Sequence, residues 1–82
     1  MKNPTPNRAT YLSELNTIAA AQVDADIAAG TLPPSARAEL LPLCETVFSA
    51  QWDVRHGHAE LDTLDAAHAA LRARNRALAI HA

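Results

Sequence analysis

Several residue types that mark particular classes of protein are scarce in this sequence. Its 82 residues include 2 glycines, 1 cysteine, and 1 each of Trp, Tyr and Phe. The single cysteine, Cys44, excludes a disulfide within the chain. No glycine-rich phosphate-binding loop is present, and the scarcity of glycine and β-branched residues favours helices over strands. With so few aromatic side chains, the core must consist mainly of Leu, Val, Ile and Ala.

Long apolar runs are also missing. No stretch approaches the roughly 18–20 apolar residues that a membrane-spanning helix needs. The polar start, residues 1–6, is followed by no hydrophobic run, so we expect no signal peptide. A single cysteine fits a reducing compartment. We therefore expect a soluble cytoplasmic protein without a membrane partner.

Neither sign of charge dominates. The 7 basic and 9 acidic residues give a net charge of −2, which argues against a general nucleic-acid binder. The distribution is uneven, because every acid lies between Glu14 and Asp65, whereas Arg72, Arg74 and Arg76 lie near the end. This arginine cluster either contacts a phosphate or an acidic partner, or it compensates the dipole at a helix C-terminus.

Proline and glycine divide the chain into segments. The two prolines in residues 1–6 predict a flexible N-terminal arm, and residues 7–82 are predicted to form a single helical domain. We expect an all-α fold with three helices over about 7–29, 35–56 and 59–80. A chain of this length has a small core and marginal stability, so we expect a dimeric helical bundle.

The ends of these helices are predicted from their capping residues. Thr5 or Asn7 is expected to cap the start of the first helix, and Gly30 to end it in a left-handed conformation. Ser35 is expected to cap the second helix with its hydroxyl.

Two positions further along leave alternatives open. Pro42 either kinks the second helix, or follows a short turn and begins that helix. Gly57 either ends the second helix or lies inside one helix of more than roughly 40 residues. The poor capping residues after Gly57 favour a continuous helix. Acids early and arginines late in the following segment favour a break, which we prefer.

The expected second helix has an unusually wide apolar face. On a helical wheel its apolar residues span an arc of roughly 200°, about twice the usual core-facing stripe. Such a helix must contact at least two neighbours, in its own chain or in another copy. Either it is a central core helix, or part of the arc stays exposed and binds a partner. The residues predicted for that partner-binding patch are Leu41, Phe48, Trp52 and Arg55.

Two charged residues interrupt the apolar stripes. Asp26 falls inside the stripe of the first helix and Arg55 inside that of the second. Either the two form an ion pair, or both point to water at the edge of their helix.

The expected third helix carries a heptad pattern. From Leu61 onward, residues at alternating spacings of three and four lie on one face, with leucine at the d-like positions. This pattern predicts an oligomer seam made of Leu61, Leu64, His68, Leu71, Asn75 and Leu78. Nearly opposite lies a row of mostly small residues, which either admits another helix closely or is simply solvated. These residues are Ala66, Ala70, Ala73, Ala77 and Ile80.

Signals for catalysis or metal binding are weak. The pairs Asp53/His56 and Asp65/His68 each place a carboxylate and an imidazole on one helical face, as in metal-binding helical bundles. Such pairs also arise by chance, so we assign no metal ligand. Cys44 falls within the apolar arc and is predicted to be an inert core thiol. Three short helices leave little room for a pocket, so we expect neither an enzyme nor a cofactor.

These observations favour a small non-enzymatic protein–protein interaction module, such as an adaptor, an inhibitor or an assembly subunit. Its Leu- and Ala-rich texture is similar to that of helical hairpins in phage packaging and regulatory proteins, although no motif is specific to a family. We expect its apolar helix faces to bind another protein or a second copy, and no small-molecule substrate. The alternatives are a nucleic-acid-associated regulator that docks through the arginine cluster, and a helical metal-binding bundle.

Overall fold

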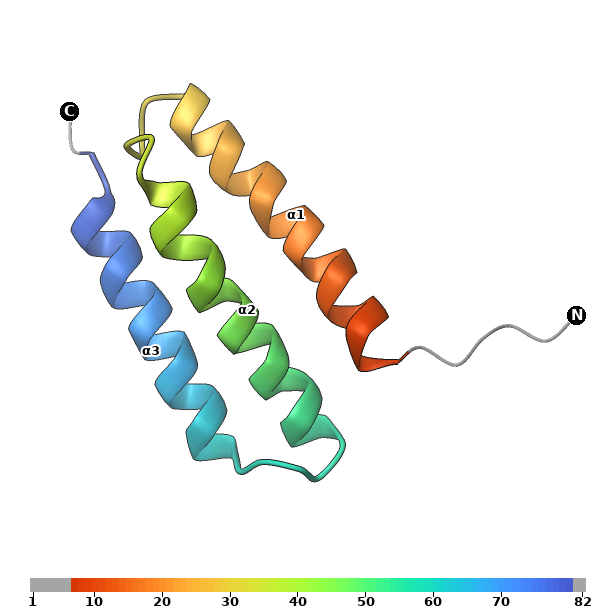
Figure 1. The fold of residues 1–82 in the computed structure, drawn as a ribbon. Helices are drawn as coiled ribbons and strands as arrows, with labels where there is room; N and C mark the ends of the chain where they lie inside the picture. Colours follow the sequence, from red (N-terminus) through yellow and green to blue (C-terminus); the bar gives the residue numbers. More distant parts are fainter. Residues whose placement is uncertain (1–6, 81–82) are drawn as a thin grey trace, which may run out of the picture.

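Three helices account for most of the chain. The computed structural model describes residues 7–80, which contain α1 (Arg8–Ala28), α2 (Ala36–Arg55), α3 (Leu61–Leu78) and no strand (Figure 1). The predicted all-α fold with three helices is confirmed, and each helix lies within its expected segment. The predicted N-terminal arm, residues 1–6, lies outside the described residues.

Side-chain and backbone caps define both ends of α1. At its start the Asn7 side chain accepts a hydrogen bond from the backbone amide of Thr10, at 2.8 Å. Beyond its end Gly30 has a φ of +82°. The backbone amide of Gly30 donates to the carbonyl of Ile27, and the next amide donates to the carbonyl of Asp26. This pair of bonds is a Schellman motif, which only a residue tolerant of positive φ completes without strain. The predicted left-handed cap at Gly30 is confirmed.

The start of α2 differs from the prediction. Ser35 has helical backbone angles, φ −69° and ψ −14°, and its hydroxyl makes no capping hydrogen bond. A side-chain cap requires an extended backbone at this position, so the predicted hydroxyl cap is wrong. The tight turn before the helix sets this conformation, because the amide of Ala36 donates to the carbonyl of Pro33 at 2.9 Å. The helix then continues through Pro42, which excludes a helix that begins there.

Gly57 separates α2 from α3. Its φ is +76°, and its amide donates to the carbonyl of Val54 at 3.2 Å. The amide of His58 donates to the carbonyl of Asp53 at 2.7 Å. This is the same Schellman motif as at the end of α1, and it confirms the predicted break at Gly57.

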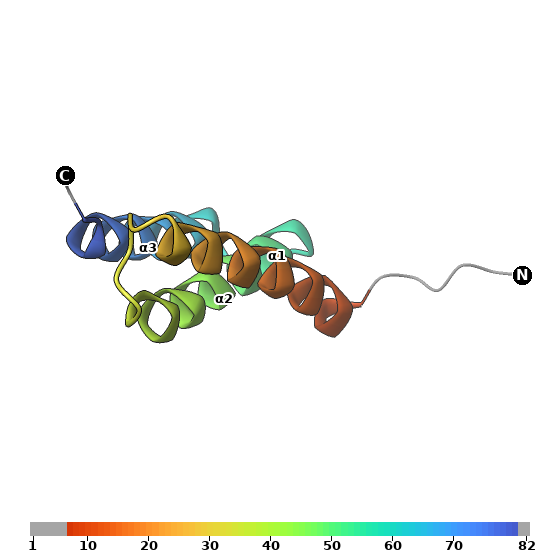
Figure 2. The ribbon, with the colours of Figure 1, turned by 90° about the horizontal axis from the view of Figure 1, so that it is seen from above.

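The three helices form a trough rather than a closed bundle. Figure 1 shows α2 between α1 and α3, and both outer helices pack against it. No Cα atom of α1 lies within 8 Å of a Cα atom of α3. Viewed from above, the ends of α1 and α3 that flank the start of α2 lie on the same side of α2 (Figure 2). One side of α2 is therefore bordered by two helices that do not close over it.

Two clusters of buried side chains run along α2. The first joins α1 to the start of α2 and consists of Val23, Leu32, Ala36 and Leu40. The second joins α2 to α3 and consists of Val47, Ala50 and Ala67. Leu71 packs against both clusters. The wide apolar arc of α2 is thus used as expected for a central helix, with one side facing α1 and another facing α3.

Candidate protein-binding groove

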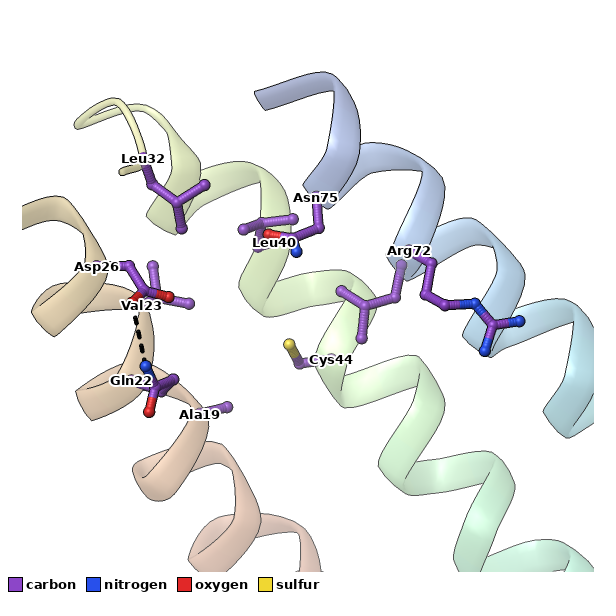
Figure 3. Close-up of a pocket in the computed structure, with 10 residues that line it drawn as sticks. Ala19, Gln22, Val23, Asp26, Leu32, Leu40, Cys44, Arg72 and Asn75 are labelled. Carbon is purple, nitrogen blue, oxygen red and sulfur yellow. Dashed lines mark hydrogen bonds between the residues drawn. The ribbon is translucent and has the colours of Figure 1, made fainter. Parts of the chain in front are cut away.

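A groove lies between α1 and α3, over one side of α2. It encloses a pocket of about 290 Å³. Residues from all three helices and from the first loop line it (Figure 3): Ala19, Gln22, Val23, Asp26, Leu32, Leu40, Cys44, Leu71, Arg72 and Asn75. Because α1 and α3 make no backbone contact, the groove remains open along the face opposite its α2 floor.

Helical spacing brings these residues to the groove. On α1, Ala19, Gln22 and Asp26 follow one another at intervals of three and four, so they share a face. On α2, Leu40 and Cys44 are four residues apart and form the floor. The floor is apolar, and the polar atoms lie on the two walls that α1 and α3 provide. This arrangement fits the apolar side of an amphipathic helix, with polar contacts along both edges.

The floor contains the only thiol of the protein. Cys44 is buried, and the loss of hydration raises the pKa of its thiol. The thiol is therefore protonated near neutral pH and is a weak nucleophile. This placement agrees with an ordinary apolar core residue rather than with a reactive centre.

The walls of the groove carry opposite charges. Asp26 on the α1 wall is half-buried and accepts a hydrogen bond from the Gln22 amide, at 3.1 Å. Arg72 on the α3 wall is exposed. Within residues 7–80 neither Asp26 nor Arg72 forms an ion pair. The predicted contact between Asp26 and Arg55 is also not formed there.

Other charged residues are paired within the chain. Arg37 binds Asp24 through both carboxylate oxygens, at 2.7 and 2.6 Å. Arg74 lies 3.5 Å from Glu39 and links α3 to α2. Both pairs are about half exposed, so each contributes no more than about 1 kcal/mol to stability. Of the predicted arginine cluster, Arg74 is engaged in this way, whereas Arg72 and Arg76 are exposed without an ion pair among the described residues.

A third ion pair lies at the opposite end of the molecule. Arg8 Nε lies 3.3 Å from Asp53 Oδ1, which links the start of α1 to the end of α2.

The predicted partner-binding patch is largely engaged within the chain. Leu41 packs against the first buried cluster and Phe48 against the second. The Trp52 indole contacts two rings, with ring centroids 5.1 Å from Tyr11 and 4.1 Å from His56. Only Arg55 is fully exposed. The structure thus places these residues in and around the core, without gathering them into one open surface; their role in binding stays a prediction.

The predicted heptad seam divides into two sets. Leu64, Leu71 and Leu78 pack against the buried clusters of their own chain. Leu61 is 60% exposed, and Asn75 is exposed on the wall of the groove. His68 is half-buried and belongs to neither set. The buried residue of α3 is Ala67, which lies outside the predicted seam. That the seam joins two copies stays a prediction.

The row of small residues on the outer face of α3 is exposed to solvent. All five residues of the row are exposed: Ala66, Ala70, Ala73, Ala77 and Ile80.

The histidine–carboxylate pairs do not form a metal site in the described part of the chain. Asp53 is bound by Arg8, and His56 stacks on Trp52. Across residues 7–80 no group of three or more His, Cys, Asp and Glu side chains is placed to hold a metal ion. Nor is any helix in this range long and apolar enough to cross a membrane.

Sequence reasoning assigned most floor residues of the groove to the core and did not identify the groove itself. Leu40 and Cys44 lie near the centre of the apolar arc of α2, so the unusual width of that arc was the available signal. On the α1 wall the available signal was Asp26, a charged residue inside the apolar stripe of that helix, whereas Ala19 and Gln22 are common on any helix surface.

No family model, curated protein or solved structure matches this chain.

Proposed function

We propose that this protein is a non-enzymatic interaction module that binds a protein helix in the groove between α1 and α3. The observation that carries the proposal is the pocket between these two helices, which no contact between α1 and α3 closes. A fourth helix over Leu40 and Cys44 would contact all three helices and cover this floor.

The shape and chemistry of the groove support a macromolecular ligand. Its floor is formed by aliphatic side chains and a protonated thiol, which offer packing surface but no group suited to bond making. Polar atoms of Gln22, Asp26 and Arg72 lie along the edges. This distribution, an apolar centre with a polar rim, is typical of helix-in-groove recognition.

A groove-filling substitution tests the proposal. Ala19→Trp places a large ring on the α1 wall, whereas Ala21→Trp places the same ring on exposed surface of α1. A displayed library of amphipathic helices is selected against the immobilised protein, and the selected clones are then tested on both variants. We expect binding to fall at least tenfold on Ala19→Trp and to persist on Ala21→Trp. Clones that bind both variants equally would contradict a binding site in the groove.

A DNA titration distinguishes the nucleic-acid alternative from a protein-binding groove. Duplex DNA is titrated at low and moderate salt against the wild-type protein and against a variant with Arg72, Arg74 and Arg76 replaced by Gln. Steeply salt-dependent binding that requires these arginines would favour a nucleic-acid regulator over a protein-binding groove.

A further inference from the structure

The two walls of the groove carry opposite charges that do not meet within residues 7–80. Asp26 and Arg72 line the same pocket, one on α1 and one on α3. Figure 3 shows the Arg72 guanidinium directed away from Asp26, on the far side of the α2 floor. Within residues 7–80, neither side chain has an ion-pair partner.

Some of the other charges on these helices are already paired within the chain. Asp24 binds Arg37, and Arg74 lies beside Glu39. Asp26 and Arg72 are the charged residues that line the pocket, and they carry opposite signs. A second copy therefore offers each wall a residue of the opposite charge.

We infer that a second copy of this protein covers the groove, with α1 of each copy lying along α3 of the other. This inference rests on the proposed function and names the partner of the same site. A two-fold axis parallel to the groove exchanges the two walls and preserves the position of each residue along it. Asp26 and Arg72 lie at the same level of the groove, because they line one pocket. The symmetry thus places Asp26 of each copy beside Arg72 of the other, and two equivalent ion pairs form at once.

Exposed apolar side chains support a partner on this side. Ile18 is 65% exposed and lies four residues before Gln22, so it extends the α1 wall. Leu61 is 60% exposed and lies on the same side of α3 as His68 and Arg72, at helical intervals. A second copy removes apolar area from water along both walls, which a small single core leaves uncovered.

Charge exchange between copies provides the test. In a dimer of Asp26→Arg, positions 26 and 72 that face each other across the two copies are both basic. In a dimer of Arg72→Asp, both are acidic. Each variant is measured alone, in an equimolar mixture with the other, and as the double variant, by light scattering after gel filtration across a range of concentrations. Glu45→Arg, an exposed position on α2 outside the groove, makes the same charge change as Asp26→Arg and serves as the control. Circular dichroism checks that each chain is folded.

We expect a wild-type mass of twice 8.8 kDa. Each single variant should dissociate on the order of tenfold more readily, because two attractive contacts become repulsive in every dimer. The mixture and the double variant should regain the wild-type dimer, and Glu45→Arg should retain it. Regain in the mixture requires contact between different chains, since neither single variant carries both charges.

Three results would overturn the inference. They are a wild-type monomer at every concentration, dimers unaffected by either single variant, and a mixture that stays monomeric although each folded single variant has lost the dimer. A wild-type monomer that still binds selected helices, and loses them in Ala19→Trp, would overturn the second copy alone and leave the proposed function standing. Insensitivity of every bound helix to Ala19→Trp would count against the proposed function itself.

Discussion

The ring of Tyr11 lies 5.1 Å from the indole of Trp52, which brings the start of α1 to the end of α2. The hydroxyl of Tyr11 also donates to Oε1 of Gln51, at 3.2 Å. The His56 ring also lies close to the indole, at 4.1 Å between ring centroids. Trp52 therefore joins the start of α1 to the end of α2.

Replacing Trp52 by Ala should lower the free energy of unfolding by about 2–3 kcal/mol. A fully buried aromatic side chain costs about 3–5 kcal/mol on truncation, and Trp52 is only half-buried. Urea unfolding followed by far-UV circular dichroism measures the change. Glu45→Ala, at an exposed position on α2 outside the groove, is the control and should cost less than about 0.5 kcal/mol. A Trp52 variant as stable as this control would contradict a contribution of the indole to the stability of the fold.

The positions of the helices could be predicted from local residue types. Gly30 and Gly57 end α1 and α2 because each completes a Schellman motif at positive φ, which is a local property of the chain. Ser35 is the counterexample. Its hydroxyl was expected to cap α2, but the turn through Pro33 sets a helical backbone before the cap position is reached.

The faces that meet in the fold could be predicted only in part. A helical wheel gives the position of each residue around its own helix, but not the rotation of that helix against its neighbours. On α3 the heptad spacing pointed to the leucine side, and Leu64 and Leu71 do face the core. Ala67 is nevertheless the buried residue of α3, because a small side chain allows close approach to Ala50 of the same cluster. The groove depends on α1 and α3 remaining apart, and no residue pattern in either helix predicts that separation.

Replacing Gly57 by Ala should destabilise the protein by about 1–2 kcal/mol, the cost of placing a side chain in the left-handed region. The substitution isolates this cost, because a Cβ atom at Gly57 would meet no other atom within 4 Å. Gly57→Asn should lose less, since Asn tolerates the left-handed conformation better than other residues. Chemical denaturation of the three proteins gives the comparison. Equal stability of the Ala variant and the wild type would show that the chain leaves α2 without a positive φ.

Replacing Pro42 by Ala should stabilise the protein by about 1–2 kcal/mol. Proline costs about 3 kcal/mol relative to alanine inside a helix, and we expect the substitution to recover part of this cost. Pro42 is exposed, so the substitution removes no core packing. It also supplies an amide that can donate to the carbonyl of Ala38. The midpoint of urea unfolding should rise without a change in the denaturant slope. A lower midpoint would mean that Pro42 is needed to bring α2 against both α1 and α3.

The buried thiol of Cys44 should make stability depend on alkaline pH. Burial raises its pKa in the folded protein, whereas the unfolded chain ionises at the ordinary value. Below the ordinary pKa both states hold the proton, and this thiol adds no pH dependence. Above it the unfolded chain loses the proton first, so the free energy of unfolding falls until the raised folded pKa is passed. The slope between these two values approaches 1.36 kcal/mol per pH unit for one proton.

Unfolding measured between roughly pH 7 and 10 on the wild type and on Cys44→Ala tests this dependence. The Ala variant is less stable at every pH, since it leaves a small cavity beside Leu40 on the floor of the groove. Its stability should nevertheless fall less steeply with rising pH, because the substitution removes the ionisation of this thiol. Alkylation of Cys44 by iodoacetamide should be slower than that of a free thiol at the same pH, for the same reason. Parallel pH profiles for the two proteins would show that the thiol is hydrated through the open groove, and that the floor is wetter than its apolar lining predicts.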